Sequence, residues 1–272
     1  KFGALSLVQL FHGGMRAPEE ITKFRPLSPS KIECSVAKCG YSQELTHKEI
    51  LNLIQAFGDA ARRCEFAGFD GIELHAAHGY LISQFLGKIT NLRTDKWGGD
   101  VSSRASFLVE IIKDIKQKTS PNFIIGVRIS PEIEDIGVEL EDSLEVSEII
   151  TRDGIDFVHI SCWDCFSSPQ KYPSSPKKIT TWFSELLENR IPIISTGSIW
   201  TVSDAEEVLN QGADLIGVAR AAIGHSDWGN HIENPLYSPD VPPFSESHLR
   251  SQGLSDVFIE YMKRWKGFVE NN

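Results

Sequence analysis

FDGIELHAAHGY, residues 69–80, joins an apolar run of strand length to two histidines and a tyrosine at its end. A continuous apolar run of this length predicts a strand buried on both faces, as in a parallel sheet. His75, His78 and Tyr80 then present hydrogen-bond donors to one small volume just past the run Phe69–Leu74. Such a set suits a reaction that builds negative charge on a carbonyl oxygen and afterwards needs a proton.

Further apolar runs of similar length alternate with amphipathic stretches along the whole chain. Strand–helix repetition with short connections predicts βαβ units and a parallel sheet, so the fold class is α/β. We expect a TIM (β/α)8 barrel, of which about the last six βα units are in this chain. A closed barrel needs eight units, so two are expected upstream of Lys1; an open sheet is the alternative. The remaining runs are Leu5–Phe11, Phe123–Ile129, Phe157–Ser161, Ile191–Thr196 and Leu215–Ala219.

The stretches between the runs carry helical patterns. Thr46-His47-Lys48-Glu49 fits a capping box ahead of an apolar stripe that runs from Ile50 to Cys64. Further stripes lie at 107–115 and 144–150, and Ser203-Asp204-Ala205-Glu206 is expected to open another helix. We expect one β/α-barrel domain over 1–272, with 228–272 as a C-terminal extension. In its tail, Leu254–Val269, apolar residues at helical spacing are expected to pack back on the body; they are Phe258, Tyr261, Met262 and Trp265.

Composition excludes some classes of partner. A net charge of -10 argues against nucleic acid, because there is no basic stripe to neutralise phosphates. No apolar stretch approaches ~20 residues, so no membrane span is expected. Five irregularly spaced cysteines do not suggest a disulfide framework, which favours a reducing, cytoplasmic compartment. An upstream targeting segment stays open because the chain starts at Lys1, and homo-oligomer formation is also left open.

Two polar residues lie in or at the end of apolar runs. Gln9 is either a hydrogen-bonded core glutamine or a partner for a donor–acceptor edge such as a flavin pyrimidine ring. Arg128, at the end of its run, requires a carboxylate or an anionic ligand. A structural ion pair and an anionic reduced flavin ring both meet that requirement.

The last two runs end in glycine-bearing turns, Ser195-Thr196-Gly197-Ser198 and Gly217-Val218-Ala219-Arg220. If two units lie upstream, these turns follow strands seven and eight, where such barrels often bind a phosphate. Glycine lets backbone N–H groups approach the anion, and Arg220 adds charge-assisted hydrogen bonds.

Other interpretations remain open for the same residues. His75 and His78 have a zinc-binding spacing, which would predict a metal hydrolase inhibited by a chelator. No third ligand is evident, because Glu73 is expected to alternate away from His75 along the strand, and no metal site is therefore expected. The histidines could also be purely structural. Cys162-Trp163-Asp164-Cys165 lacks a partner pair, so its thiols are expected to be inert.

Three segments together resemble the old yellow enzyme family of NAD(P)H-dependent flavin oxidoreductases: Val8–Arg16, Gly71–Leu81 and Asn91–Gly99. The resemblance implies a β/α barrel whose first two strands precede Lys1. It implies FMN held by Gln9 and Arg128 at the ring. At the FMN phosphate it implies Gly197, Ser198, Ala219 and Arg220, and it implies a structural role for Arg93, Asp95, Trp97 and Arg104.

The resemblance also implies an activity. NADH or NADPH would reduce FMN, which would then reduce activated alkenes, namely α,β-unsaturated carbonyl or nitro compounds. His75 and His78 match the pair that binds the carbonyl oxygen of a small enone-type substrate, and Tyr80 matches the proton donor. The alternative is a flavin-free barrel fragment that acts as a binding or assembly module.

Overall fold

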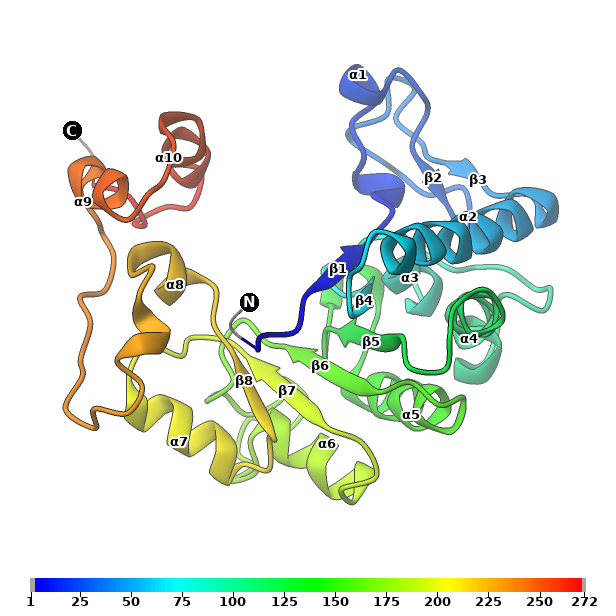
Figure 1. Ribbon diagram of the computed structural model, residues 1–272. Coiled ribbons are helices and arrows are strands. Elements are labelled where there is room, and N and C mark those ends of the chain that lie inside the picture. Colours follow the sequence, from blue (N-terminus) through cyan, green and yellow to red (C-terminus); the bar gives the residue numbers. More distant parts are fainter. Residues whose placement is uncertain (1–2, 271–272) are drawn as a thin grey trace.

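The computed structural model describes residues 3–270, which fold around a six-stranded parallel sheet (Figure 1). The order of strands across the sheet is their order along the chain, and every neighbouring pair is parallel. The prediction of six βα units is therefore confirmed. The strands are β1 (Leu7–Leu10), β4 (Gly71–Ala76), β5 (Ile124–Ile129), β6 (Phe157–Ser161), β7 (Ile193–Thr196) and β8 (Leu215–Gly217).

Within residues 3–270 the sheet is open, with β1 and β8 at its two edges. The expectation that every strand is buried on both faces is correct for the central strands and wrong at these edges. Gln9 on β1 is exposed, and Leu215 on β8 is 55% exposed. An edge strand has a neighbour on one side only, so its inward-facing side chains are covered by fewer residues. Gln9 is thus exposed at this edge of the described sheet.

Five helices cover the outer face of the sheet (Figure 1). The first of them, α2, starts after Thr46, and the predicted capping box with Glu49 is present. Thr201, not a residue at 203, caps α7, which corrects the predicted start of that helix. α6 was not predicted at all. The helices are α2 (His47–Phe66), α4 (Val101–Lys118), α5 (Leu140–Arg152), α6 (Ile179–Leu187) and α7 (Val202–Asn210).

The main core lies between the sheet and these helices. Phe107 on α4 stacks on Phe85 with ring centroids 4.3 Å apart and meets Phe57 of α2 edge to face. Both Phe85 and Phe107 are fully buried, and each such side chain stabilises the fold by about 1.5–3 kcal/mol. This layer holds the strands, and hence their carboxyl ends, in fixed register.

Long connections follow β1, β4 and β6 at the carboxyl ends of the strands. They contain the short elements α1 (Glu19–Thr22), β2 (Leu27–Ser28), β3 (Gln43–Glu44) and α3 (Leu81–Leu86). Arg93 joins two of these connections, because its Nη1 donates to the carbonyl oxygens of Pro29 at 2.8 Å and Leu45 at 2.7 Å. Its side chain is 8% exposed and also bonds Asp95. These contacts are those of a residue that orders loops.

The C-terminal segment forms α8 (Arg220–Gly224), α9 (Glu246–Ser251) and α10 (Asp256–Met262), and α9 and α10 lie beyond the end of β8 (Figure 1). Its small core contacts Trp200 and Ile223, which confirms that the tail packs back on the body. Trp265 lies past the end of α10. The assignment of 1–272 to one domain stays a prediction. No helix in residues 3–270 has both the length and the hydropathy to cross a membrane.

Candidate active site

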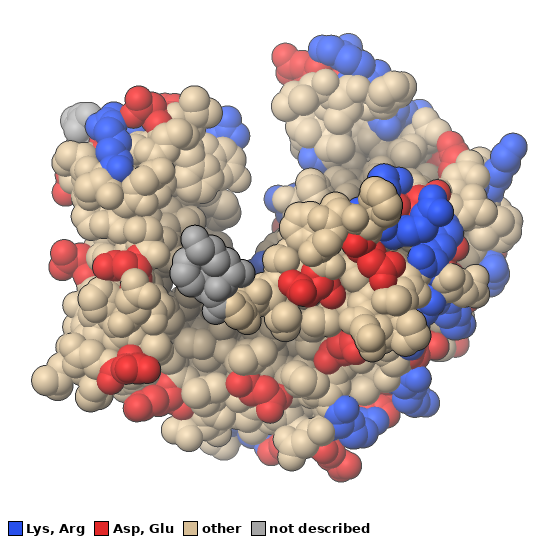
Figure 2. Space-filling view, in the orientation of Figure 1, with Lys and Arg blue, Asp and Glu red and all other residues tan. Residues whose placement is uncertain are grey.

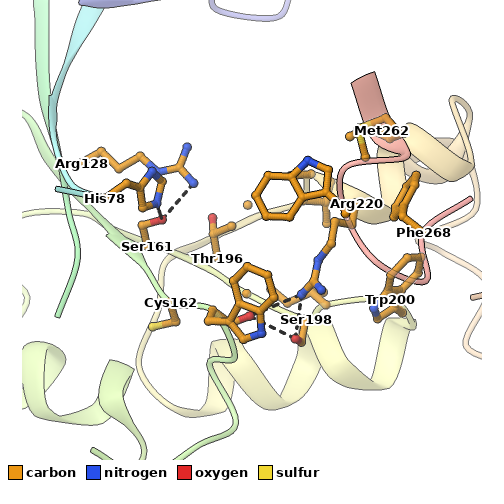
Figure 3. A pocket seen from close by; sticks show the side chains of 18 of the residues that line it. His78, Arg128, Ser161, Cys162, Thr196, Ser198, Trp200, Arg220, Met262 and Phe268 are labelled. Carbon is orange, nitrogen blue, oxygen red and sulfur yellow. Dashed lines mark hydrogen bonds between the residues drawn. The ribbon is translucent and has the colours of Figure 1, made fainter. Parts of the chain in front are cut away.

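A cavity of about 310 Å³ lies at the carboxyl ends of β5 to β8, and one face of the molecule is hollowed on this side (Figures 2 and 3). It brings together most of the residues that the sequence indicated. The C-terminal segment supplies its opposite wall, which sequence reasoning missed; this wall includes Phe258, Tyr261, Met262, Trp265 and Phe268. Of the predicted site residues, those that line the cavity are His78, Arg128, Gly197, Ser198, Ala219 and Arg220.

His75 and Tyr80 lie beside the cavity next to His78. The His75 ring is 4.9 Å from the rings of both His78 and Tyr80, measured between centroids. Strand β4 extends to Ala76, so His75 is the strand's fifth residue and not a residue past its end, as the sequence had indicated. Nδ1 of His75 accepts the Ala77 N–H at 3.2 Å. The neutral ring therefore carries its proton on Nε2, where it can be donated to a ligand.

His78 is held in a left-handed backbone conformation, with φ of 59°. Such a conformation costs free energy in a non-glycine residue and persists only when neighbours enforce it. Here the backbone N–H of His78 donates to Ser130 Oγ at 3.1 Å, and its carbonyl oxygen accepts from Arg16 Nη1 at 2.7 Å. The ring Nε2 lies 2.7 Å from Ser161 Oγ (Figure 3). These contacts fix the imidazole at the cavity wall.

Both imidazoles are neutral near pH 7. Burial, followed by the positive charge of Arg128, lowers the pKa of His75 to about 4. The ring of His78 keeps an accessible edge, yet desolvation by the surrounding protein, then His75 and Arg128, lowers its pKa to about 4 as well. A neutral imidazole donates one hydrogen bond, so the pair can polarise a carbonyl oxygen without carrying charge.

Arg128 has no carboxylate within 4.0 Å among residues 3–270, so the structural ion pair allowed by the sequence is not found in this part of the chain. Its Nη2 donates to Ser161 Oγ at 3.0 Å. Its Nε is buried and has no hydrogen-bond partner. A buried donor left unpaired costs about 1–3 kcal/mol, which an anionic or acceptor-bearing ligand in the cavity would recover.

The turns after β7 and β8 meet at the other end of the cavity. Arg220 Nη2 donates to Ser198 Oγ at 3.0 Å, and the Arg220 guanidinium lies 5.0 Å from the centre of the Trp163 ring (Figure 3). Gly197 has φ of 147°, and a Cβ there would lie 2.7 Å from the carbonyl oxygen of Cys162. Ala219 immediately precedes the amino end of α8. The sequence had predicted this convergence at a phosphate-binding end.

A chain of polar side chains on the inner face of the sheet was not predicted. Gln9 Nε2 donates to Glu73 Oε1 at 2.5 Å, and Glu73 Oε2 lies 2.6 Å from His159 Nδ1. The expectation that Glu73 alternates away from His75 is wrong, because residues two apart on a strand share a face. The same period of two places His159 and Ser161 together on β6, and that signal could have revealed them.

Neither a metal site nor reactive thiols emerge from this geometry. In the part of the chain that the structure describes, no three His, Cys, Asp or Glu residues gather as metal ligands would. Burial raises the pKa of Cys165 to about 12 and also raises that of Cys162, so both thiols stay protonated. The Cys165 thiol donates to the Gly197 carbonyl oxygen at 2.8 Å. This supports the prediction that the Cys-x-x-Cys pair is inert.

The residues around the cavity fit FMN, the cofactor that the resemblance implies. A flavin needs hydrogen-bond donors and positive charge at its ring, and Arg128 offers a buried Nε without a partner. A phosphate needs charge-assisted donors, and Arg220 has no carboxylate within 4.0 Å among the described residues. Arg128 and Arg220 both line the one cavity.

Comparison with known proteins identifies the family. The model of the NADH:flavin oxidoreductase / NADH oxidase family matches residues 1–238. The probable NADH-dependent flavin oxidoreductase YqiG of Bacillus subtilis is 33% identical over 232 residues, which are 83% of this chain and 62% of that protein. NADPH dehydrogenase of Clostridium acetobutylicum is 35% identical over 228 residues, covering 82% of this chain and 65% of that protein.

The fold agrees with this assignment. The old yellow enzyme homologue from Zymomonas mobilis superposes with a TM-score of 0.72 at 26% identity, over 88% of this chain and 69% of that one. The six-stranded sheet thus matches part of an old yellow enzyme barrel, and this chain spans less than two thirds of the two relatives named above. The chain belongs to the NADH:flavin oxidoreductase / NADH oxidase family, as its resemblance to the old yellow enzymes had indicated.

Proposed function

We propose that the protein is an FMN-dependent NAD(P)H oxidoreductase that reduces activated alkenes, with α,β-unsaturated carbonyl or nitro compounds as substrates. One observation carries the proposal. Arg128 and Arg220 line one cavity without a carboxylate partner in residues 3–270, next to a cluster of two neutral histidines and a tyrosine. Unpaired guanidinium groups favour an anionic ligand, and the neighbouring donors favour an oxygen that gains negative charge.

Each end of the cavity has a role in holding the cofactor. Arg128 at one end would contact the ring of FMN, together with Gln9, which does not line the cavity. Gly197, Ser198, Ala219 and Arg220 at the other end would contact its phosphate. When bound, FMN accepts hydride from NADH or NADPH and delivers hydride to the alkene. The positive charge of Arg128 would stabilise negative charge on the reduced ring.

The cluster of His75, His78 and Tyr80 would bind and protonate the alkene substrate. His75 donates from Nε2 and His78 from its ring to the carbonyl or nitro oxygen, which stabilises the enolate-like charge that develops there. Tyr80 then gives its phenolic proton to the α-carbon, while the β-carbon receives hydride. The product is the saturated carbonyl or nitro compound, and solvent returns a proton to Tyr80.

The proposal includes a cytoplasmic location, since all five cysteines, which lie in the described part of the chain, carry free thiols. Its test is a visible absorption spectrum of the purified protein, followed by NADPH and then an enone, both added without oxygen. A yellow protein that bleaches with NADPH and regains its colour with the enone supports an ene-reductase. A colourless protein that does not take up added FMN would overturn it and favour a flavin-free binding module.

A further inference from the structure

Glu73 is a largely buried carboxylate, 13% exposed, for which the proposed mechanism has no role. It stands on β4 at the centre of a polar chain that crosses the inner face of the sheet. Gln9 Nε2 lies 2.5 Å from Glu73 Oε1, His159 Nδ1 lies 2.6 Å from Glu73 Oε2, and His159 Nε2 lies 2.6 Å from Thr196 Oγ1. These hydrogen bonds thus link β1, β4, β6 and β7, and of these strands β6 and β7 reach the cavity, with Ser161 and Thr196.

Two features connect this row of hydrogen-bonded side chains with the candidate active site. The side chains of Glu73 and His159 are only 13% and 12% exposed, and a buried carboxylate is costly unless its oxygens are bonded. Thr196, the last member, lines the cavity. Burial raises the pKa of Glu73, but the hydrogen bond and charge of His159, the hydrogen bond of Gln9 and the charge of Arg128 lower it overall. Glu73 is therefore a carboxylate anion near pH 7.

We propose that Glu73, oriented by His159, is a positioning residue that fixes the Gln9 amide and lowers the reduction potential of FMN bound beside Arg128. The inference rests on the proposed function. Because the carboxylate accepts from Nε2, the amide of Gln9 has one defined orientation, and its Oε1 and second N–H remain for a ligand.

The sign of the effect on potential follows from the charges. Reduction of flavin to its anionic reduced form adds negative charge, which Arg128 favours and Glu73 opposes. A substitution that removes the negative charge of Glu73 and keeps the shape of its side chain leaves the positive charge of Arg128 less neutralised. The protein should then bind reduced FMN more tightly relative to oxidised FMN, which raises the reduction potential.

The experiment compares four FMN-loaded variants with the wild type by equilibrium reduction against reference dyes. For Glu73→Gln we expect the ratio of binding constants, reduced over oxidised FMN, to rise at least tenfold, which for a two-electron couple is about 30 mV. Glu73→Asp keeps the charge, so its reduction potential should lie close to that of the wild type. His159→Gln keeps the carboxylate and should give a potential no higher than the wild type.

The matched control is Asp142→Asn. Asp142 is also a buried carboxylate, bonded by Arg104 at 3.0 Å and Lys88 at 3.0 Å, but it does not line the cavity. Its loss should lower stability and leave the potential unchanged. If Asp142→Asn shifts the potential as much as Glu73→Gln does, the effect is one of general destabilisation and the inference is wrong.

A second readout needs no cofactor. In FMN-free protein, a side-chain N–H of Gln9 bonded to a carboxylate should give a downfield amide proton resonance, assigned by its loss in Gln9→Leu. We expect it to move upfield in Glu73→Gln, because a neutral amide oxygen accepts more weakly than a carboxylate, and to be unchanged in Asp142→Asn. Two outcomes would overturn this inference but not the proposed function. One is that the wild type lacks this resonance, and the other is that FMN-loaded Glu73→Gln has the reduction potential of the wild type. A wild type that binds no FMN would overturn the proposed function together with the effect on potential.

Discussion

The rings of His75 and Tyr80 meet edge to face, with centroids 4.9 Å apart and planes at 88°. Both come from one strand end, His75 from within β4 and Tyr80 from the turn that caps α3. The contact places an imidazole donor and a phenolic proton beside each other, and the two groups can act on different atoms of one substrate. One can hold the oxygen of a conjugated substrate while the other reaches its α-carbon.

We therefore expect Tyr80→Phe to separate the two half-reactions. Loss of the phenolic proton should slow alkene reduction by about 10²–10⁴-fold, the usual contribution of a general acid. Flavin reduction by NADPH requires no proton from Tyr80 and should stay within about twofold of the wild type. Stopped-flow absorbance of the flavin measures both steps on one sample.

The control for this variant is Tyr172→Phe. This variant also removes a phenolic hydroxyl, whose Oη donates to Glu141 at 2.5 Å, but Tyr172 stacks on Trp182 outside the cavity. It should leave both half-reactions unchanged. An equal loss of both half-reactions in Tyr80→Phe would contradict the role assigned to Tyr80.

Replacing His75 and His78 together by Ala should abolish the binding of phenols. A phenol oxygen resembles the charged oxygen of the reacting substrate, and two donors to it are worth about 1–3 kcal/mol each. The measurement is the long-wavelength charge-transfer band that a phenol produces with the flavin. His231→Ala, which removes an exposed histidine paired with Asp227, is the control and should keep the band. A band that survives in the double variant would show that phenols bind elsewhere.

Arg220→Met should weaken FMN binding and spare riboflavin. Arg220 lines the cavity next to Ser198, and hydrogen bonds to a charged group contribute about 1.5–3 kcal/mol. We expect Kd for FMN to rise about tenfold to a hundredfold, while Kd for riboflavin, which has no phosphate, changes little. Flavin fluorescence titration measures both constants. Arg152→Met, on the exposed side of α5, provides the control. Equal losses for the two flavins would place the phosphate away from Arg220.

Strand positions were predictable because apolar content alone marks a central parallel strand. The apolar run predicts that the strand ends at Leu74, because polar residues follow, but β4 continues through His75 to Ala76. Helix α6 was missed because Ile179-Thr180-Thr181-Trp182-Phe183 is rich in β-branched and aromatic residues, which have low helix propensity. Burial of one face of α6, at Thr180, Phe183 and Leu187, outweighs that propensity.

The site was predictable where the chemistry sits at strand ends, since parallel strands bring their carboxyl ends together. Arg128 and His78 could be expected near each other for this reason. The strand period could place Ser161 on the same face, but its contacts with both residues could not be predicted, because the sequence does not show the register between strands. The same holds for Glu73 and His159, which meet across β5. The wall formed by the C-terminal segment depends on how that segment folds back, which no local pattern indicates.

The lowered pKa of His75 makes stability depend on pH in a defined window. Its pKa falls from 6.5 to about 4 in the folded protein, so the unfolded chain takes up a proton first as the pH decreases. The contribution to stability is constant above pH 6.5 and is lost progressively between pH 6.5 and 4. His78 acts in the same direction.

Replacing His75 by Gln, which does not titrate, should remove this dependence. Although the variant is expected to be less stable at pH 7, its further loss on going to pH 4.5 should be smaller than that of the wild type by roughly 2 kcal/mol. Urea unfolding at pH 7.5, 6.5, 5.5 and 4.5, run on both proteins, gives the two profiles. Parallel profiles over the whole range would mean that His75 keeps an ordinary pKa in the folded state. It could then be charged at the pH of the reaction, and the assignment of a neutral donor to the substrate oxygen would fail.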